Sequence, residues 1–545
     1  MRVRRAVARS VAAVGDRIHA VRVLAGAGLV RPARPDRLVR SGLALHRWGP
    51  TPAAGYEASA ARFSDEAAII DELGTLTFGE VQLRTNALAH GLSDAGILEG
   101  DGVAVMCRNH RGFIETTIAL SKLGAHALFL NTAFAAPQLA DVVARERPKA
   151  IVFDEEFREL LSEAARRRKR FVAWHHDAAD APSDPTLEEL IARGDPANVV
   201  PPAEKGRVVI LTSGTTGTPK GAARSQPETV DPAVTMLSRI PLRARETTVI
   251  AAPLFHSWGF AHFTLGLLLS STYVLRRRFD PEATLALVAR HRATTLPVVP
   301  VMLQRILELP EETRRAHDVS SLRVVPVSGS ALPGDLARRF MDEFGDVLYN
   351  LYGSTEVAWA TIATPSELRE APGTAGSAPR GTVLKILDEE GRPLPTGRTG
   401  RIFVTNEMLF EGYTGGGAKE VVEGLMSTGD VGHLDGRGRL FVEGRDDEMI
   451  VSGGENVFPA EVEDLLARHD AVGEVAVIGV ADEDFGQRLK AFVVTRVGAT
   501  LSDDEVKRHV KSNLAGYKVP RDVEFIDELP RNATGKVVKR ELAER

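Results

Sequence analysis

Short runs of valine and isoleucine alternate with helical patterns from about residue 60 to residue 440, and this alternation limits the fold more than any other feature of the chain. The clearest segments are apolar runs at 149–153, 207–211, 248–251 and 322–327 and helical patterns at 283–291 and 334–344. Strands that alternate with helices build βαβ units. The sequence therefore predicts an α/β fold of stacked, mainly parallel sheets covered by helices.

The pattern changes twice in the last third of the chain. Between Gly381 and Val404 short strands are joined by turns, which predicts a smaller antiparallel or barrel-like piece. After Gly444 the sequence predicts a compact α+β unit, with helices at 459–469 and 503–514 and strands at 474–480 and 490–494. We therefore expect a basic N-terminal extension at 1–55, a large domain at 56–444 and a small, mobile C-terminal domain at 445–545.

Composition and charge exclude several classes of protein. The chain has 545 residues, a net charge of −5 and a pI near 6.3, so no global electrostatic field attracts nucleic acid. The single cysteine, Cys107, ends the apolar run that starts at Val103 and is expected to be a buried core thiol. The apolar stretch Phe260–Leu275 is shorter than the ~20 residues that cross a bilayer, so we expect a cytoplasmic chain without a membrane span.

The N-terminal extension has an unusual charge pattern. Residues 1–50 contain eleven arginines, no lysine and only two acids. Charged residues between Asp16 and Arg22 interrupt the apolar run, which argues against a secretory signal. Apolar side chains recur every three or four residues from Val3 to Leu24, so one face of a helix carries them. Residues 1–48 therefore fit a helix at an anionic membrane surface, a helix docked on the protein itself, or a start site assigned too early.

The most specific motif is Thr212-Ser213-Gly214-Thr215-Thr216-Gly217-Thr218-Pro219-Lys220-Gly221, which directly follows an expected strand. Its glycines let backbone N–H groups turn toward an anion, its hydroxyls add donors, and Lys220 supplies a positive charge. Counted from Gly214, the spacing differs from a Walker A loop, which requires Gly-Lys-Ser/Thr after four residues. The motif is therefore predicted to cradle a triphosphate outside the P-loop class.

This loop resembles the signature of the adenylate-forming superfamily, whose members include acyl-CoA synthetases, adenylation domains and beetle luciferases. Further motifs follow in that family's order from about residue 60 to the C-terminus. The resemblance implies two half-reactions, in which ATP and a carboxylic acid form an acyl-adenylate and pyrophosphate, and the acyl group then passes to a thiol. It also implies ATP contacts at Thr212, Ser213, Gly214, Thr215, Thr216, Gly217 and Lys220.

A second segment resembles the family's contacts to adenine and the α-phosphate. In Tyr352-Gly353-Ser354-Thr355-Glu356 the resemblance implies that Tyr352 stacks on adenine, Thr355 contacts the α-phosphate and Glu356 holds Mg²⁺. Gly353 is implied to be a further ATP contact. A hard cation prefers carboxylate and phosphate oxygens, which agrees with this role. Taken alone, the same residues are typical of a helix N-cap.

Three further positions complete the implied nucleotide contacts. Ser330 lies in a loop that the family places against adenine. Asp430 ends the Ser-Thr-Gly-Asp motif, whose aspartate is implied to bind both ribose hydroxyls through strong charge-assisted bonds. Arg445 matches a further ribose contact.

The remaining implied residues belong to the small domain and its junction. Asp447 falls at the family's hinge, and Gly453 and Gly454 match the loop that approaches the pantetheine arm of CoA. Lys536 matches the catalytic lysine, which reaches the active site only when the small domain closes and then bridges the acid's carboxylate and the α-phosphate. Only nine residues follow Lys536, so we expect the acceptor to be a separate molecule.

The acid itself is indicated less directly. His256 resembles a residue that orients the acid's carboxylate, although a core histidine packed between aromatic side chains is the alternative. The segment around it lacks the aspartate of amino-acid-activating relatives, so we expect an acid without an amine. The apolar stretches 260–275 and 295–303 suit an alkyl chain, which makes a medium- or long-chain fatty acid the preferred substrate.

Three functions stay open. The preferred one is a fatty acyl-CoA ligase that uses ATP, Mg²⁺ and CoA. Free CoA is the expected acceptor because family members that load a carrier protein usually contain an extra insertion before the hinge, and this chain has none. The second is an aryl-acid CoA ligase or a fatty acyl-AMP ligase that loads a carrier protein. The third is a nucleotide-sensing protein without catalysis, and the presence of Lys220, Glu356, Asp430, Arg445 and Lys536 argues against it. The sequence does not indicate an oligomeric state.

Overall fold

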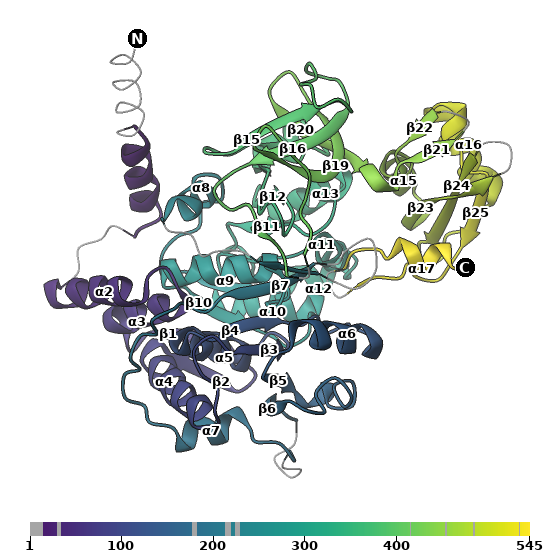
Figure 1. Ribbon diagram of the computed structural model, residues 1–545. Helices are drawn as coiled ribbons and strands as arrows, with labels where there is room; N and C mark the ends of the chain where they lie inside the picture. Colours follow the sequence, from purple (N-terminus) through teal and green to yellow (C-terminus); the bar gives the residue numbers. More distant parts are fainter. Residues whose placement is uncertain are drawn as a thin grey trace.

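The protein divides into a large N-terminal domain and a small C-terminal domain (Figure 1). The computed structural model describes residues 15–29, 34–176, 182–212, 220–223, 229–414, 416–452, 455–482, 486–532 and 535–545. Within these ranges, three sheets and their helices form the large domain, and a fourth sheet forms the small one. The predicted α/β class, with a large first domain and a smaller second domain, is confirmed.

The first sheet has the strand order β2-β1-β10-β9. Its strands are β1 (Ala67–Asp71), β2 (Gly74–Thr77), β9 (Thr247–Ile250) and β10 (Thr272–Leu275). Strand β10 pairs in parallel with both β1 and β9, as the alternating pattern predicts. The chain around this sheet forms α3 (Pro52–Phe63), α4 (Phe78–Asp94), α8 (Asp231–Arg239) and α9 (Ser257–Leu269).

The second sheet contains the two strands that flank the predicted phosphate-binding loop. Its order is β17-β8-β7-β4-β3-β5-β6, and it is parallel from β7 to β6. Its strands are β3 (Gly102–Met106), β4 (His126–Phe129), β5 (Ala150–Asp154), β6 (Lys169–Trp174), β7 (Val208–Thr212), β8 (Lys220–Ala223) and β17 (Gly412–Tyr413). The helices between them are α5 (Arg111–Leu123), α6 (Ala136–Glu146) and α7 (Leu187–Arg193). The loop joins the end of β7 to its antiparallel partner β8.

The third sheet runs in the order β11-β12-β13-β14-β20-β19-β16-β15, with β18 paired to β19. Its strands are β11 (Val325–Val327), β12 (Leu348–Tyr352), β13 (Thr361–Ala363), β14 (Gly376–Ser377), β15 (Val383–Leu387), β16 (Gly400–Thr405), β18 (Val421–Val422), β19 (Leu425–Leu434) and β20 (Arg439–Arg445). The piece expected at 381–404 is β15 and β16, which are antiparallel to each other and continue into β19 and β20. Nearby helices are α10 (Pro281–His291), α11 (Pro300–Leu307), α12 (Glu311–Arg315), α13 (Gly334–Phe344) and α14 (Pro365–Glu370).

Helix α9 lies between two cores of the large domain. Trp258 and Leu269 pack in one cluster with the strands of the third sheet, whereas Phe263 and Leu267 pack in another with α5 and β4. A helix that is apolar on all sides is typically buried. The stretch Phe260–Leu275 therefore mostly fills the core, and it is not the open alkyl-binding wall expected from the sequence.

The C-terminal domain is the α+β unit that the sequence predicts. Its strands are β21 (Ile450–Ser452), β22 (Glu455–Val457), β23 (Val472–Asp482), β24 (Gly486–Thr495) and β25 (Asp522–Phe525), and its helices are α15 (Pro459–Ala467), α16 (Asp503–Asn513) and α17 (Lys539–Ala543). Its own core includes Val462, Val477 and Val510, each fully buried. A short 3-10 turn, Asp446–Glu448, links β20 to β21 and thus joins the two domains.

The described part of the N-terminal extension, residues 15–29 and 34–55, contains two helices that precede α3. Residues 15–26 are helical, and the chain then packs Ala27 into the core. The second helix, α2 (Pro35–Trp48), packs against α3. No helix of the described chain is both long and apolar enough to cross a membrane.

Candidate active site

Lys220 and Glu356, which are expected to bind phosphate and Mg²⁺, lie near the place where β8 pairs with β17. Lys220 opens β8, and its Nζ lies 5.2 Å from the centroid of the Tyr413 ring. Tyr413 is on β17, paired with Ala222 of β8, and its hydroxyl donates a hydrogen bond of 2.8 Å to Glu356 Oε1. The structure thus joins the predicted Lys220 and Glu356 through a tyrosine that the sequence analysis missed.

Hydrogen bonds to the main-chain carbonyls of Glu356 and its neighbours fix the position of this residue. The Phe410 N–H donates to its carbonyl at 2.7 Å, and Asn406 Nδ2 donates to the carbonyls of Val357 and Trp359 at 2.8 and 2.7 Å. Glu356 is only 8% exposed. Burial and the charge of Glu356 together raise the pKa of Tyr413, so its phenol stays protonated and acts as the donor.

Asp430 lies at the centre of a second group of side chains. The Tyr352 hydroxyl donates to Asp430 Oδ2 at 2.5 Å, and Arg445 Nη1 lies 3.5 Å from Asp430 Oδ1. The pairing of β19 with β20 sets this geometry, because Asp430 stands opposite Arg445. Burial raises the pKa of Asp430, whereas the bond from Tyr352 and the charges of Arg445, Lys536 and Lys419 oppose that rise. Tyr352, Asp430 and Arg445 are therefore brought together as expected.

Glycines allow the main chain to approach closely around these groups. At Gly429, with a φ of +82°, a side chain would begin 3.0 Å from Lys419 Nζ and 3.2 Å from Arg445 Nη1. At Gly353 it would begin 2.2 Å from the Ala358 carbonyl oxygen, so the turn that carries Thr355 folds back on itself only with glycine there. Gly429 is therefore favoured by its positive φ, and Gly353 is required for space.

The loop after β11 is the one that is expected to lie against adenine. Gly329 has a φ of +100°, a conformation that favours glycine, and its α-carbon faces Val299. Ser330 follows it and is half-buried. The loop expected against adenine therefore lies beside the segment that leads into α11.

The Lys536 loop of the small domain reaches the large domain (Figure 1). A side chain at Gly535 would begin 2.4 Å from Val301 Cγ1, so this loop contacts the first turn of α11. The Lys536 N–H donates to Asn532 Oδ1 at 3.0 Å, which closes the turn, and the charge of Lys536 acts on Asp430. The small domain therefore touches α11 next to Lys536, and the charge of Lys536 reaches Asp430 across the two domains.

His256 stands at the N-terminus of α9 and is half-buried. Desolvation lowers its pKa to about 4, so its imidazole is neutral near pH 7. Two residues on, Trp258 Nε1 donates to the Val298 carbonyl at 3.0 Å, which ties the start of α9 to the segment that contacts Gly535. Trp258 also meets His262 edge to face, with ring centroids 4.5 Å apart. A row of aromatic rings thus leads away from His256 along α9.

Several expected site residues cannot be compared with the structure. The loop residues Ser213, Gly214, Thr215, Thr216 and Gly217 and the CoA-loop residues Gly453 and Gly454 lie outside the described residues. Thr212 ends β7 and Asp447 lies in the turn between the domains, but the description covers only their backbones.

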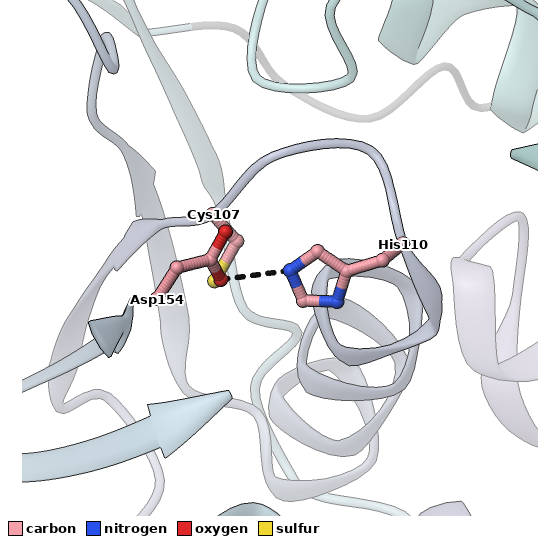
Figure 2. Close-up of side chains that lie close together, drawn as sticks. All are labelled: Cys107, His110 and Asp154. Carbon is pink, nitrogen blue, oxygen red and sulfur yellow. Dashed lines mark hydrogen bonds and ion pairs between the residues drawn. The ribbon is translucent and has the colours of Figure 1, made fainter. Parts of the chain in front are cut away.

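A cluster of Cys107, His110 and Asp154 lies away from this site and is completely buried (Figure 2). The Gly112 N–H donates to His110 Nδ1 at 3.1 Å, so Nε2 carries the proton that is shared with Asp154 at 2.7 Å. Burial, and then the charge of Asp154, raise the pKa of the Cys107 thiol, which disfavours a thiolate ligand. The cluster therefore favours a structural role that caps α5, and the expected core thiol is confirmed.

The fold and the site together define a two-domain α/β protein, in which the loop that carries Lys536 in the small domain contacts the large domain. Comparison with known families agrees with this class. The chain belongs to the AMP-binding enzyme family, since that family's model matches residues 56–414 and the model of its C-terminal domain matches residues 461–536. Membership of the adenylate-forming superfamily is thereby confirmed.

Individual relatives cover nearly the whole chain. A feruloyl-CoA synthase from Amycolatopsis sp. is 35% identical and covers 89% of this chain and 97% of its own length. An indoleacetate–CoA ligase from Aromatoleum aromaticum is 33% identical, over 85% of this chain and 92% of its own. Among solved structures, ATP-bound MatB from Rhodopseudomonas palustris has a TM-score of 0.80 at 28% identity, covering 90% of this chain and 98% of its own. An anthranilate CoA ligase in complex with anthranoyl-AMP has a TM-score of 0.81 at 25% identity, covering 91% and 96%.

Proposed function

We propose that this protein is an ATP-dependent ligase that joins an aromatic carboxylic acid to CoA through an acyl-adenylate. In the first half-reaction a carboxylate oxygen bonds to the α-phosphorus of ATP, and the bond to pyrophosphate breaks. In the second, the CoA sulfur bonds to the carbonyl carbon, its proton is lost, and AMP leaves. The observation that carries the proposal is the position of the Lys536 loop, which contacts Val301 of the large domain while the charge of Lys536 acts on Asp430.

The described residues have distinct roles in this scheme. Asp430, held by Tyr352 and Arg445, binds the ribose hydroxyls, and the Tyr352 ring is left to stack on adenine. Lys536 places a positive charge where the carboxylate attacks phosphorus, and such preorganised charges stabilise transition states. His256, neutral near pH 7, orients the acid by a hydrogen bond without forming an ion pair.

The phosphate side fits a bound Mg²⁺. Glu356 offers carboxylate oxygens of the kind that Mg²⁺ prefers, and Lys220 stands across the Tyr413 ring to share the phosphate charge. When bound, the ion neutralises charge on the departing pyrophosphate. Tyr413 then acts as a positioning residue, because its hydrogen bond fixes one oxygen of Glu356.

Two lines of support favour an aromatic acid over the fatty acid that the sequence suggested. The relatives at 35% and 33% identity carry the names of ligases for ferulate and indoleacetate, both ring-containing acids. In the structure, most of the apolar stretch expected to line an alkyl tunnel is core, which removes the sequence argument for a long alkyl chain.

A panel of acids tests the substrate class. Release of AMP that depends on CoA should be measured for ferulate, indoleacetate, anthranilate and straight-chain acids from acetate to palmitate. We expect kcat/KM for the best aromatic acid to exceed that of the best straight-chain acid by at least ~10-fold, the scale at which pocket shape discriminates. A preference for straight chains would overturn the aromatic class and leave the ligase chemistry intact.

The same panel tests the acceptor. CoA should be compared with a phosphopantetheine-charged carrier protein at equal concentration. Faster acylation of the carrier would favour the carrier-loading alternative. Absence of both AMP release and pyrophosphate exchange with every acid would overturn the ligase assignment itself.

A further inference from the structure

Helix α2 is fixed to the large domain by one face only. Ser41, Ala44 and Trp48 are buried against α3, Ser41 Oγ donates to the Ala58 carbonyl, and Trp48 Nε1 donates to Glu57 at 2.5 Å. These residues are spaced by three or four positions, so they form one stripe of the helix. The opposite side of the helix points away from α3, and no hydrogen bond from it to another element is found among the described residues.

Four exposed apolar side chains lie on the sides of α2 that do not face α3. Leu38, Val39, Leu43 and Leu45 are 46%, 61%, 45% and 50% exposed. Ile18 and Val21 of the preceding helix are 50% and 60% exposed as well. Single exposed apolar side chains are normal on a soluble protein, but adjacent ones on one helix face mark an interaction surface.

The same segment is strongly basic. The described part of the extension has six arginines beside these apolar side chains, namely Arg17, Arg22, Arg34, Arg37, Arg40 and Arg47. Its two acids are paired, Asp16 with Arg380 and Asp36 with Arg34. Because the whole chain has a net charge of −5, this positive region contrasts with the rest of the molecule.

We propose that the outward face of α2 docks on an anionic lipid surface, with Leu38, Val39, Leu43 and Leu45 inserted at the level of the headgroups. Apolar burial and the attraction of arginines to acidic lipids act together on such a helix. A second copy of this chain is the less suitable occupant, because two-fold pairing of the same face would set arginine against arginine. Helix α2 lies on the opposite side of the molecule from the C-terminal domain, so docking leaves that domain unobstructed (Figure 1).

Co-sedimentation of the full chain with vesicles tests this proposal. Phosphatidylcholine vesicles with and without phosphatidylglycerol are compared at low and high salt. The variant Leu38→Ser/Val39→Ser/Leu45→Ser removes apolar contact, and Arg40→Ser/Arg47→Ser removes charge. The matched control, Val383→Ser/Val421→Ser/Val497→Ser, removes three exposed apolar side chains elsewhere. Thermal unfolding and activity on a soluble acid confirm that each variant is folded.

We expect wild type and control to bind phosphatidylglycerol vesicles in a salt-sensitive way, and the apolar variant to bind at least ~10-fold more weakly. Vesicle binding by the arginine variant should depend less on phosphatidylglycerol than binding by the wild type does. Failure of the wild type to bind, or equal binding by the apolar variant, overturns the proposal. A dimer in solution that the apolar variant dissociates, without vesicle binding, would assign the face to a second copy and overturn it too.

Discussion

At the scale of single residues, the site depends on charges that are held by neighbours distant in sequence. Asp430 receives its hydrogen bond from Tyr352 of another strand, and Lys536 approaches it from the other domain. Sequence motifs predicted each of these residues but not their contacts.

Lys536 can be tested by separating the half-reactions. Lys536→Ala removes a charge that stabilises the pentavalent phosphorus, so pyrophosphate exchange should fall by roughly 10²–10³. Thioester formation from supplied acyl-adenylate should be nearly unchanged. The control is Lys507→Ala, which removes an ammonium paired with Asp503 on α16. An equal loss in both half-reactions would show that Lys536 supports folding or acts in both.

Tyr413 provides a second residue-scale prediction. Tyr413→Phe keeps the ring beneath Lys220 and removes the bond to Glu356, a charge-assisted bond of about 1.5–3 kcal/mol. Pyrophosphate exchange should fall by roughly 10–100-fold, with a higher apparent KM for Mg·ATP and no loss of thermal stability beyond the control. Tyr517→Phe, at an exposed tyrosine of the small domain, is that control. Unchanged exchange in Tyr413→Phe would remove Tyr413 from the site.

The sequence analysis missed Tyr413 for a physical reason. Strand β17 is only Gly412–Tyr413 long, and it pairs with β8, about 190 residues earlier in the chain. No local periodicity marks so short a strand. The glycine-rich run after Tyr413 was the available signal, since such runs often lie beside phosphates.

At the scale of elements, long periodic segments were predicted well and buried apolar ones were misinterpreted. Helix α13 has the predicted bounds, Gly334–Phe344, because its apolar residues recur at helical spacing. Strand β11 is shorter than expected and keeps only Val325–Val327. The apolar run of α9 suggested a substrate wall, but hydrophobicity alone does not distinguish a core from a pocket.

The burial of His262 in α9 makes the stability of the protein depend on pH. Burial lowers the pKa of His262 to about 3, well below an unfolded histidine, so the unfolded chain binds a proton that the folded chain does not. The stability that depends on neutral His262 is therefore present above pH ~6.5 and is lost as the pH falls. Between pH ~6.5 and ~4.5, the free energy of unfolding should fall by about 2–3 kcal/mol less in His262→Phe than in the wild type.

Urea unfolding at several pH values measures this slope. His46→Phe, on the exposed side of α2, is the control and should behave like wild type. A His262→Phe variant with the wild-type slope would contradict the buried neutral imidazole.

At the scale of the whole molecule, the account requires two domain arrangements. The structure has the Lys536 loop against Val301, which suits adenylation. For thiol transfer we propose rotation about the turn Asp446–Glu448, where Asp447 is the predicted hinge. Asp446 pairs with Arg401 of the large domain and Glu448 pairs with Lys539 of the small domain, so each end of the turn is held by its own domain.

A reversible cross-link tests the rotation. A side chain at Gly535 would place its β-carbon 3.4 Å from Val301 Cβ, close to disulfide geometry. Oxidised Val301→Cys/Gly535→Cys should retain pyrophosphate exchange and lose roughly 10²-fold in thioester formation, since the acceptor cannot be aligned. Reduction should restore it, and Gly535→Cys alone measures the strain of a side chain at a φ of +78°. Thioester formation that is insensitive to oxidation would show that no rotation is needed.

Isotope transfer tests the central claim of an acyl-adenylate most directly. A preferred aromatic acid with ¹⁸O in its carboxylate is incubated with ATP, CoA and the enzyme, and the nucleotide product is analysed by mass spectrometry. If a carboxylate oxygen attacks the α-phosphorus, the released AMP carries one ¹⁸O atom from the acid. Unlabelled AMP, or ADP with the label in inorganic phosphate, would contradict the proposed chemistry.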